Sequence, residues 1–142
     1  MSLFLQPMGK LVIYVDQSWS MPGPVWTRSC SAFKYVTLIS DELQLRSVWS
    51  NGSYMKGPNV AEVNVRVLFE DPDKNRLYLD YLVRTDMPKH ERGEAPAIMS
   101  GRFEVDETLE QYAWLNRTQV VGKAFLNWEN MTQNYDLYAL RW

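Results

Sequence analysis

Hydrophobic and polar side chains alternate most strictly in residues 62–84. Residues 62–70 and 76–84 each follow a period of two, and residues 71–75 separate them as a turn. Such alternation is typical of strands with one buried face. Pairing Glu70 with Arg76 places opposite charges together on one face and apolar side chains on the other, whereas a slip of one residue destroys both patterns. The predicted antiparallel pairs are Glu70–Arg76, Phe69–Leu77, Val67–Leu79, Arg66–Asp80, Val65–Tyr81, Val63–Val83 and Glu62–Arg84.

Shorter strand-like segments fill most of the remaining chain. Asn51-Gly52 is a tight-turn signal between two of them. About eight short strands with little helix predict an all-β protein, and we favour a closed antiparallel β-barrel because closure removes exposed edges. Besides the hairpin, we expect strands at residues 10–15, 32–39, 43–49, 53–56, 102–105, 112–126 and 135–142.

Residues 16–31 form a long segment without a strand pattern. Pro22 and Pro24 exclude a central strand here, so we expect a long irregular loop. Its two large aromatic residues, Trp19 and Trp26, either cover the core or belong to a lid over a binding site.

Three other segments also lack a strand pattern. We expect an irregular crossing at residues 85–101, one helical turn at residues 106–111 and a turn at residues 127–134.

Composition fits one folded domain over residues 1–142. Apolar residues make up 46% of the chain, which is enough for a hydrophobic core. The net charge of −2 and the lack of a Lys/Arg run argue against nucleic-acid binding. No apolar stretch approaches the length of a membrane span and no signal peptide is visible, so we expect a cytoplasmic protein.

The chain offers little material for metal or nucleotide chemistry. Cys30 and His90 are the only residues of their types, so intrachain disulfides and thiolate or histidine-rich metal sites are excluded. No Gly-rich phosphate loop is present, and we expect no cofactor. A Ser-His-Asp triad would need His90, which lies in the Pro- and charge-rich residues 87–93.

The polar face of the hairpin is the first candidate site. It carries Asn64, Arg66, Tyr78 and Asp80. This face either meets solvent or lines a barrel wide enough for one small ligand. In a cavity, Arg66 held by Asp80 would bind an anionic group through its planar guanidinium.

Tyr112, Trp114 and Asn116 form the second candidate, because they share one face of the strand predicted at residues 112–126. They are either aromatic core with a hydrogen-bonded amide or an aromatic wall of a ligand pocket. Joining both candidates gives a predicted ligand site of Asn64, Arg66, Tyr78, Asp80, Tyr112, Trp114 and Asn116.

Residues 112–117, Tyr-Ala-Trp-Leu-Asn-Arg, resemble the C-terminal signature of the domain-of-unknown-function family 3237, a group of small bacterial and fungal β-barrel proteins. Residues 63–66, 71–79 and 135–138 resemble the family's hairpin and closing strand. The resemblance implies a barrel similar to the allene-oxide-cyclase and dirigent type, whose members hold apolar or aromatic small molecules.

Two classes of function follow. The chain is either a barrel that binds a small, partly aromatic or anionic molecule, with cofactor-independent lyase, isomerase or cyclase activity as one form of this function, or a non-enzymatic homo-oligomeric interaction module. We also expect a homodimer, given the prevalence of two-fold assemblies and the 13% aromatic content.

Overall fold

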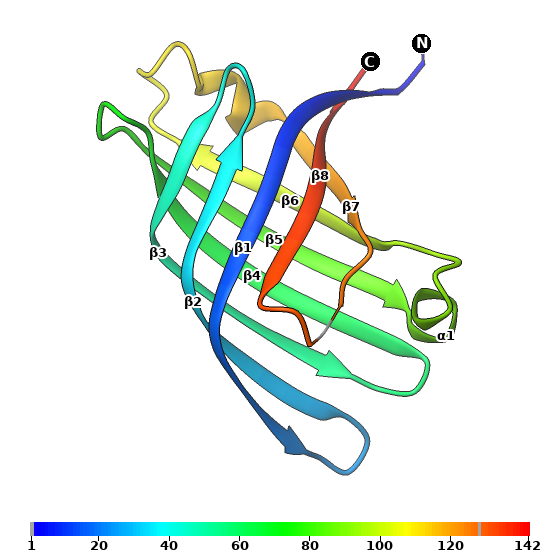
Figure 1. Cartoon of the computed structure of the whole chain (residues 1–142). Helices are drawn as coiled ribbons and strands as arrows, with labels where there is room; N and C mark the ends of the chain where they lie inside the picture. The colour runs from blue at the N-terminus through cyan, green and yellow to red at the C-terminus, as the bar shows by residue number, and fades with distance from the viewer. Residues whose placement is uncertain (1, 128) are drawn as a thin grey trace.

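Eight antiparallel strands form a closed barrel in the computed structural model, which describes residues 2–127 and 129–142 (Figure 1). Each strand pairs with the next along the chain, and the eighth pairs with the first. The predicted fold class is therefore confirmed. The strands are β1 (Phe4–Pro22), β2 (Thr27–Ile39), β3 (Gln44–Lys56), β4 (Val60–Glu70), β5 (Arg76–Asp86), β6 (Ala97–Val105), β7 (Gln119–Ala124) and β8 (Thr132–Arg141).

Helical structure is minor. Within the described residues it is limited to α1 (Met87–Glu91) and the 3₁₀-helix η1 (Ala113–Arg117). Neither helix is long and apolar enough to cross a membrane.

The β4–β5 hairpin has the predicted register. Arg66 lies opposite Asp80, and Val65 lies opposite Tyr81. The alternating face that carries Val65, Val67 and Leu79 points into the barrel, where Val67 and Leu79 are fully buried. The apolar face is therefore the core face, and the charged face is the outer wall.

The predicted loop at residues 16–31 is instead a hairpin, so that prediction was wrong. β1 continues to Pro22 and β2 starts at Thr27, and the Gly23 amide bonds the Trp26 carbonyl across the turn. The prolines lie at and inside this turn, where no ladder hydrogen bond is lost. Trp19 is 58% exposed, so it does not cover the core.

Asn51-Gly52 was also misread, because both residues lie inside β3 rather than in a turn. A Cβ atom at Gly52 would lie 2.6 Å from the ring of Phe33. The glycine therefore marks a place where a neighbouring ring packs against the backbone.

The segment after β5 contains more order than the sequence indicates. α1 and most of β6 occupy the predicted crossing at residues 85–101. The predicted strand at 112–126 divides into η1 and the short β7. The predicted turn at 127–134 includes Trp128, which lies outside the described residues, and its last three positions already belong to β8.

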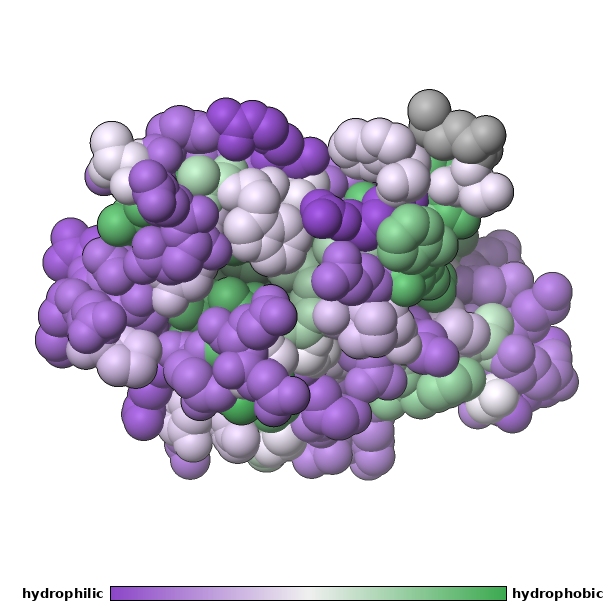
Figure 2. Space-filling view, turned by 90° about the horizontal axis from the view of Figure 1, so that it is seen from above, coloured by the Kyte–Doolittle hydropathy of each residue, from purple (hydrophilic) through white to green (hydrophobic). Residues whose placement is uncertain are grey.

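The two ends of the barrel differ. η1 covers one end, and its Leu115 is fully buried. Viewed onto this end, mostly hydrophilic side chains cover the surface, with hydrophobic ones visible between them (Figure 2). The other end carries α1, the β1–β2 and β3–β4 turns and the β7–β8 connection (Figure 1).

Candidate functional site

A cavity of about 120 Å³ opens at the α1 end of the barrel. It reaches inward to the level of Val65 and Tyr135, beyond which Val67, Leu79 and Leu137 fill the interior. Its walls come from β1 to β4, β8 and the β7–β8 connection. The lining residues are Ile13, Val15, Ser18, Ser31, Phe33, Gly52, Ser53, Tyr54, Val63, Val65, Leu126, Asn130, Met131, Gln133 and Tyr135.

The lining is apolar with a few uncharged polar groups. Within residues 2–127 and 129–142, no Asp, Glu, Lys, Arg or His borders the cavity. Burying an ionised ligand without a charged partner costs several kcal/mol at least. The cavity therefore suits an uncharged molecule. Its size suits about one aromatic ring, because an apolar cavity of about 150 Å³ holds benzene in another protein.

Two tyrosines meet at the inner end of the cavity. Tyr135 of β8 lines it, and Tyr81 of β5 packs edge-on against Tyr135 with ring centroids 5.8 Å apart. Both residues are buried. Burial raises the pKa of each phenol well above its ordinary value. Both groups therefore stay protonated at neutral pH and act as hydrogen-bond donors.

His90 supports the cavity mouth from α1. Its Nδ1 lies 2.9 Å from the Ala95 carbonyl oxygen, while the Leu126 amide donates to Nε2 at 3.1 Å. The ring also stacks on Phe125. The tautomer with its proton on Nδ1 matches both bonds. His90 thus attaches α1 to the connection that carries Leu126 to the cavity.

Two serine pairs continue outward from the cavity along the β1–β2 hairpin. Ser18 and Ser31 have hydroxyl oxygens 2.7 Å apart, and those of Ser20 and Ser29 are 2.6 Å apart. In each pair one hydroxyl donates and the other keeps its own proton. The path into the cavity is therefore polar but uncharged on this side.

The hairpin residues of the predicted site lie on the outer wall, so their predicted place inside the barrel was wrong. Arg66 has a 59% exposed side chain and lies 3.9 Å from Asp80. Asn64 is also exposed, and Tyr78 is half-buried on the same outer face. Asn64 and Arg66 border a shallow outer hollow together with Cys30 and Asn51.

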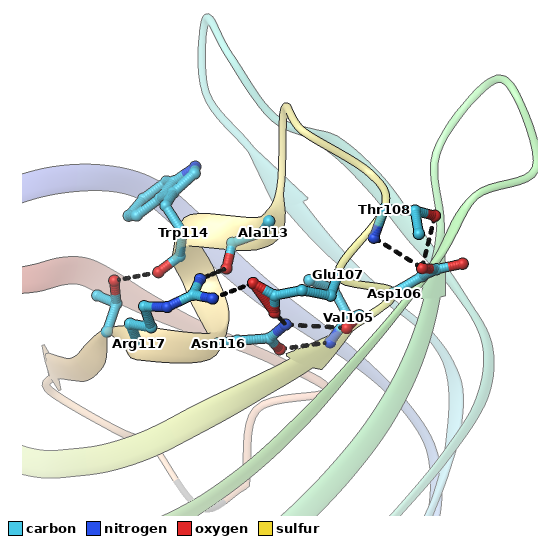
Figure 3. Close-up of polar contacts among 9 residues, drawn as sticks. Val105, Asp106, Glu107, Thr108, Ala113, Trp114, Asn116 and Arg117 are labelled. Carbon is cyan, nitrogen blue, oxygen red and sulfur yellow. Dashed lines mark hydrogen bonds and ion pairs between the residues drawn. The ribbon is translucent and has the colours of Figure 1, made fainter.

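The prediction that Tyr112, Trp114 and Asn116 share one strand face was also wrong, because η1 replaces the predicted strand. Tyr112 is buried and bonds Asp71, whereas the Trp114 ring lies 5.5 Å from the Arg141 guanidinium. Asn116 accepts from the Val105 amide and donates to the Val105 carbonyl (Figure 3).

The Asn116 amide also donates to Glu107, which pairs with Arg117 (Figure 3). These contacts attach η1 to the end of β6. The second candidate group therefore forms the covered end of the barrel, opposite the cavity.

Sequence reasoning missed the cavity because it assigned binding to polar strand faces. Val63 and Val65 were correctly placed on the apolar face, and Tyr135 begins the alternating run of the last strand. The available signal for a cavity was the phenol of Tyr135 on an inward face among apolar residues. Gln133 and Ser18 gave no such signal, since each lies in a segment read as a turn or loop.

The sequence matches no protein-family model and no curated protein. Several solved structures resemble the whole barrel. A β-barrel-like protein from Acinetobacter baumannii AYE has a TM-score of 0.80 at 20% identity, with 99% of this chain and 98% of that chain covered. A conserved protein of unknown function from Rhodopseudomonas palustris has a TM-score of 0.81 at 15% identity, with 99% of both chains covered.

An enzyme from Penicillium herquei is more distant. Its TM-score is 0.67 at 10% identity, with 99% of this chain and 94% of that chain covered. At these identities the likenesses show a shared fold alone. Membership of the domain-of-unknown-function family 3237 stays a prediction.

Proposed function

We propose that this protein binds an uncharged, largely apolar small molecule of about one aromatic ring in the cavity at the α1 end of the barrel. The observation that carries the proposal is an inward cavity with apolar walls and no charged lining residue in the described part of the chain. Ligand sites of this make-up combine hydrophobic walls with a few placed polar groups. This proposal replaces the anionic ligand that Arg66 was expected to bind.

The chemistry at the cavity favours binding over proton transfer. The phenol of Tyr135 is held protonated by burial, which raises its pKa, so it is a poor base at neutral pH. A lyase, isomerase or cyclase activity stays a prediction, and any such reaction would use hydrogen-bond donation at this wall. The fold shared with the Penicillium herquei enzyme is compatible with either function.

Ethylbenzene is a suitable first probe because it is neutral and contains one ring. Binding to the folded state raises the melting temperature as ligand concentration increases. We expect ethylbenzene to raise the Tm, and benzoate and benzylamine at equal concentration to leave it unchanged. Direct titration by calorimetry gives the Kd.

Val63→Phe provides the test of location. Val63 lines the cavity, so a larger ring there fills it and should weaken ethylbenzene binding at least tenfold. Arg66→Ala on the outer wall is the matched control and should bind as the wild type does. Equal binding by Val63→Phe in a folded protein, or no binding by the wild type, contradicts the proposal.

We also propose a homodimer formed through the β1–β2 hairpin. The last β1–β8 pair is Tyr14–Thr132, so in the described structure residues 17–22 have a strand neighbour on one side only. Trp19 and Met21 on this segment are 58% and 63% exposed. An unpaired edge of this kind readily pairs with a strand of a second copy.

Sedimentation tests the homodimer. A two-fold axis at Trp19 would place the two Trp19 side chains on the same face of a continuous sheet. We expect Trp19→Lys to shift the wild-type dimer to monomer, whereas Trp49→Lys, at another exposed tryptophan on β3, should not. A wild-type monomer at high concentration would refute this interface.

A further inference from the structure

Tyr81 has a buried hydroxyl that makes no well-formed hydrogen bond to any described residue. The side chain is 1% exposed, and in the described residues its oxygen has no partner in normal hydrogen-bond geometry. An unsatisfied buried donor destabilises a fold by about 1–3 kcal/mol. Buried groups of this kind call for a specific explanation, and a hydrogen bond to Tyr135 that forms when a ligand is bound is one.

We propose that Tyr81 and Tyr135 form a hydrogen-bond relay that selects ligands with a neutral carbonyl group. This inference rests on the proposed function, since it concerns the inner wall of the same cavity. In the relay, Tyr81 donates to Tyr135 and Tyr135 donates to the ligand oxygen. The ligand class is therefore an uncharged aryl ketone or a compound of similar shape and polarity.

The position of the two residues supports this direction of donation. Tyr135 lines the cavity, whereas Tyr81 lies behind it and reaches the ligand space only through its contact with Tyr135. The Tyr81 hydroxyl is near enough to perturb Tyr135: the contact acts to raise the pKa of Tyr81 and to lower that of Tyr135. Because Tyr135 alone of the two borders the ligand space, Tyr81 is the donor and Tyr135 the acceptor in the proposed relay.

At the inner wall the two phenols then leave one donor for the ligand. Each phenol has a single O–H group, and once Tyr81 has donated to Tyr135, the Tyr135 proton is free to reach the cavity. Hydrogen bonds in such a chain strengthen one another in a low-dielectric interior. A carbonyl oxygen fits this donor best, because it accepts and carries no proton that itself needs a partner.

The uncharged lining disfavours ionised ligands. A carboxylate would accept the same hydrogen bond, but no Lys, Arg or His borders the cavity in the described part of the chain to balance it. A ligand amine would arrive protonated and would meet no carboxylate. The uncharged lining therefore favours a neutral ligand, and Tyr135 favours one with an acceptor at the inner wall.

The test is a cycle of two ligands and two proteins. Ethylbenzene and acetophenone have nearly the same shape, and only acetophenone accepts a hydrogen bond. The ratio of the acetophenone affinity to the ethylbenzene affinity should be about fivefold or more higher in the wild type than in Tyr135→Phe. This factor corresponds to about 1 kcal/mol for one hydrogen bond. Tyr81→Phe should remove part of this preference, and Tyr78→Phe on the outer wall should remove none.

A spectroscopic readout keeps the test independent of variant stability. The carbonyl stretch of ¹³C-labelled acetophenone should have a lower frequency in the wild-type complex than in apolar solvent. In the Tyr135→Phe complex its frequency should return to the value in apolar solvent. If Tyr135→Phe does not fold, an unshifted carbonyl stretch in the wild type alone overturns the relay.

The outcomes separate the two proposals. If ethylbenzene binds but the ratio of the two affinities is the same in wild type and Tyr135→Phe, the relay is wrong and the neutral-ligand function stands. If neither compound binds the wild type, both are wrong.

Discussion

The Tyr112 hydroxyl donates a 2.7 Å hydrogen bond to Oδ2 of Asp71, although the two residues are 41 positions apart in the chain. Asp71 begins the β4–β5 turn, and its carboxylate also accepts from the backbone amides of Asp73 and Asn75. This contact attaches the segment before η1 to the hairpin turn. It is therefore central to the covered end of the barrel.

Tyr112→Phe should destabilise the protein without changing ligand affinity. A hydrogen bond to a charged group contributes about 1.5–3 kcal/mol, so we expect a loss of that size in the free energy of unfolding measured in urea. Burial and the bond to Asp71 raise the pKa of Tyr112 to about 12, so the bond persists across the neutral range. Tyr78→Phe serves as the control, and equal stability of the two variants would argue against the role of this bond.

Acid should weaken the covered end through Asp71. Burial acts to raise the pKa of its carboxyl, but hydrogen bonds from Tyr112, Asn75 and Asp73 outweigh it and lower the pKa below the ordinary 3.8. A carboxyl with a lowered folded-state pKa contributes stability above its unfolded pKa, and this contribution is lost as pH falls through the folded value. Unfolding curves of wild type and Asp71→Asn between pH 7 and pH 2 should therefore converge on acidification. Parallel curves would contradict this.

Arg66→Ala should change little. The Arg66–Asp80 pair lies on the outer wall with both partners exposed, and exposed pairs contribute about 0–1 kcal/mol. We expect a stability change within that range and unchanged affinity for ethylbenzene, measured by calorimetry. A tenfold loss of affinity would return this residue to the binding site and would contradict the inward cavity.

The sequence predicted register better than it predicted which face binds. In the β4–β5 hairpin, charge pairing and apolar pairing constrain one another, so Arg66 could be placed opposite Asp80 from the sequence alone. The same alternation cannot say whether the polar face meets water or a ligand. Barrel closure decides this, because the inside is small and the Val and Leu face fills it.

Local signals failed where tertiary packing overrides them. Gly52 follows an asparagine as in a tight turn, but the Phe33 ring against its backbone explains the glycine. The aromatic spacing of residues 112–116 fits a strand, but the buried bond from Tyr112 and the contacts of Asn116 with Val105 stabilise a 3₁₀-helix. Neither contact is visible in the sequence, since each joins residues more than ten positions apart.

Thr85→Val should stabilise the protein. The Thr85 hydroxyl is buried near the open end, and within the described structure it has no hydrogen-bond partner. Valine has nearly the same shape and removes an unsatisfied polar group, so we expect a gain of about 1 kcal/mol in the free energy of unfolding. Ser29→Ala is a useful contrast, because Ser29 is buried but bonded to Ser20, and it should lose stability. A loss in Thr85→Val would indicate a partner for that hydroxyl.

The pairing of β1 with β8 joins Phe4 to Arg141, whereas every other strand pair connects sequence neighbours. Seven hairpins can form by local zipping, but this seam requires the chain to close a loop of nearly its whole length. Loop-closure entropy makes such a contact slow to form relative to local ones. The order of assembly is therefore built into the topology: a curved ribbon of hairpins comes first, and the barrel exists only once its two outermost strands have met.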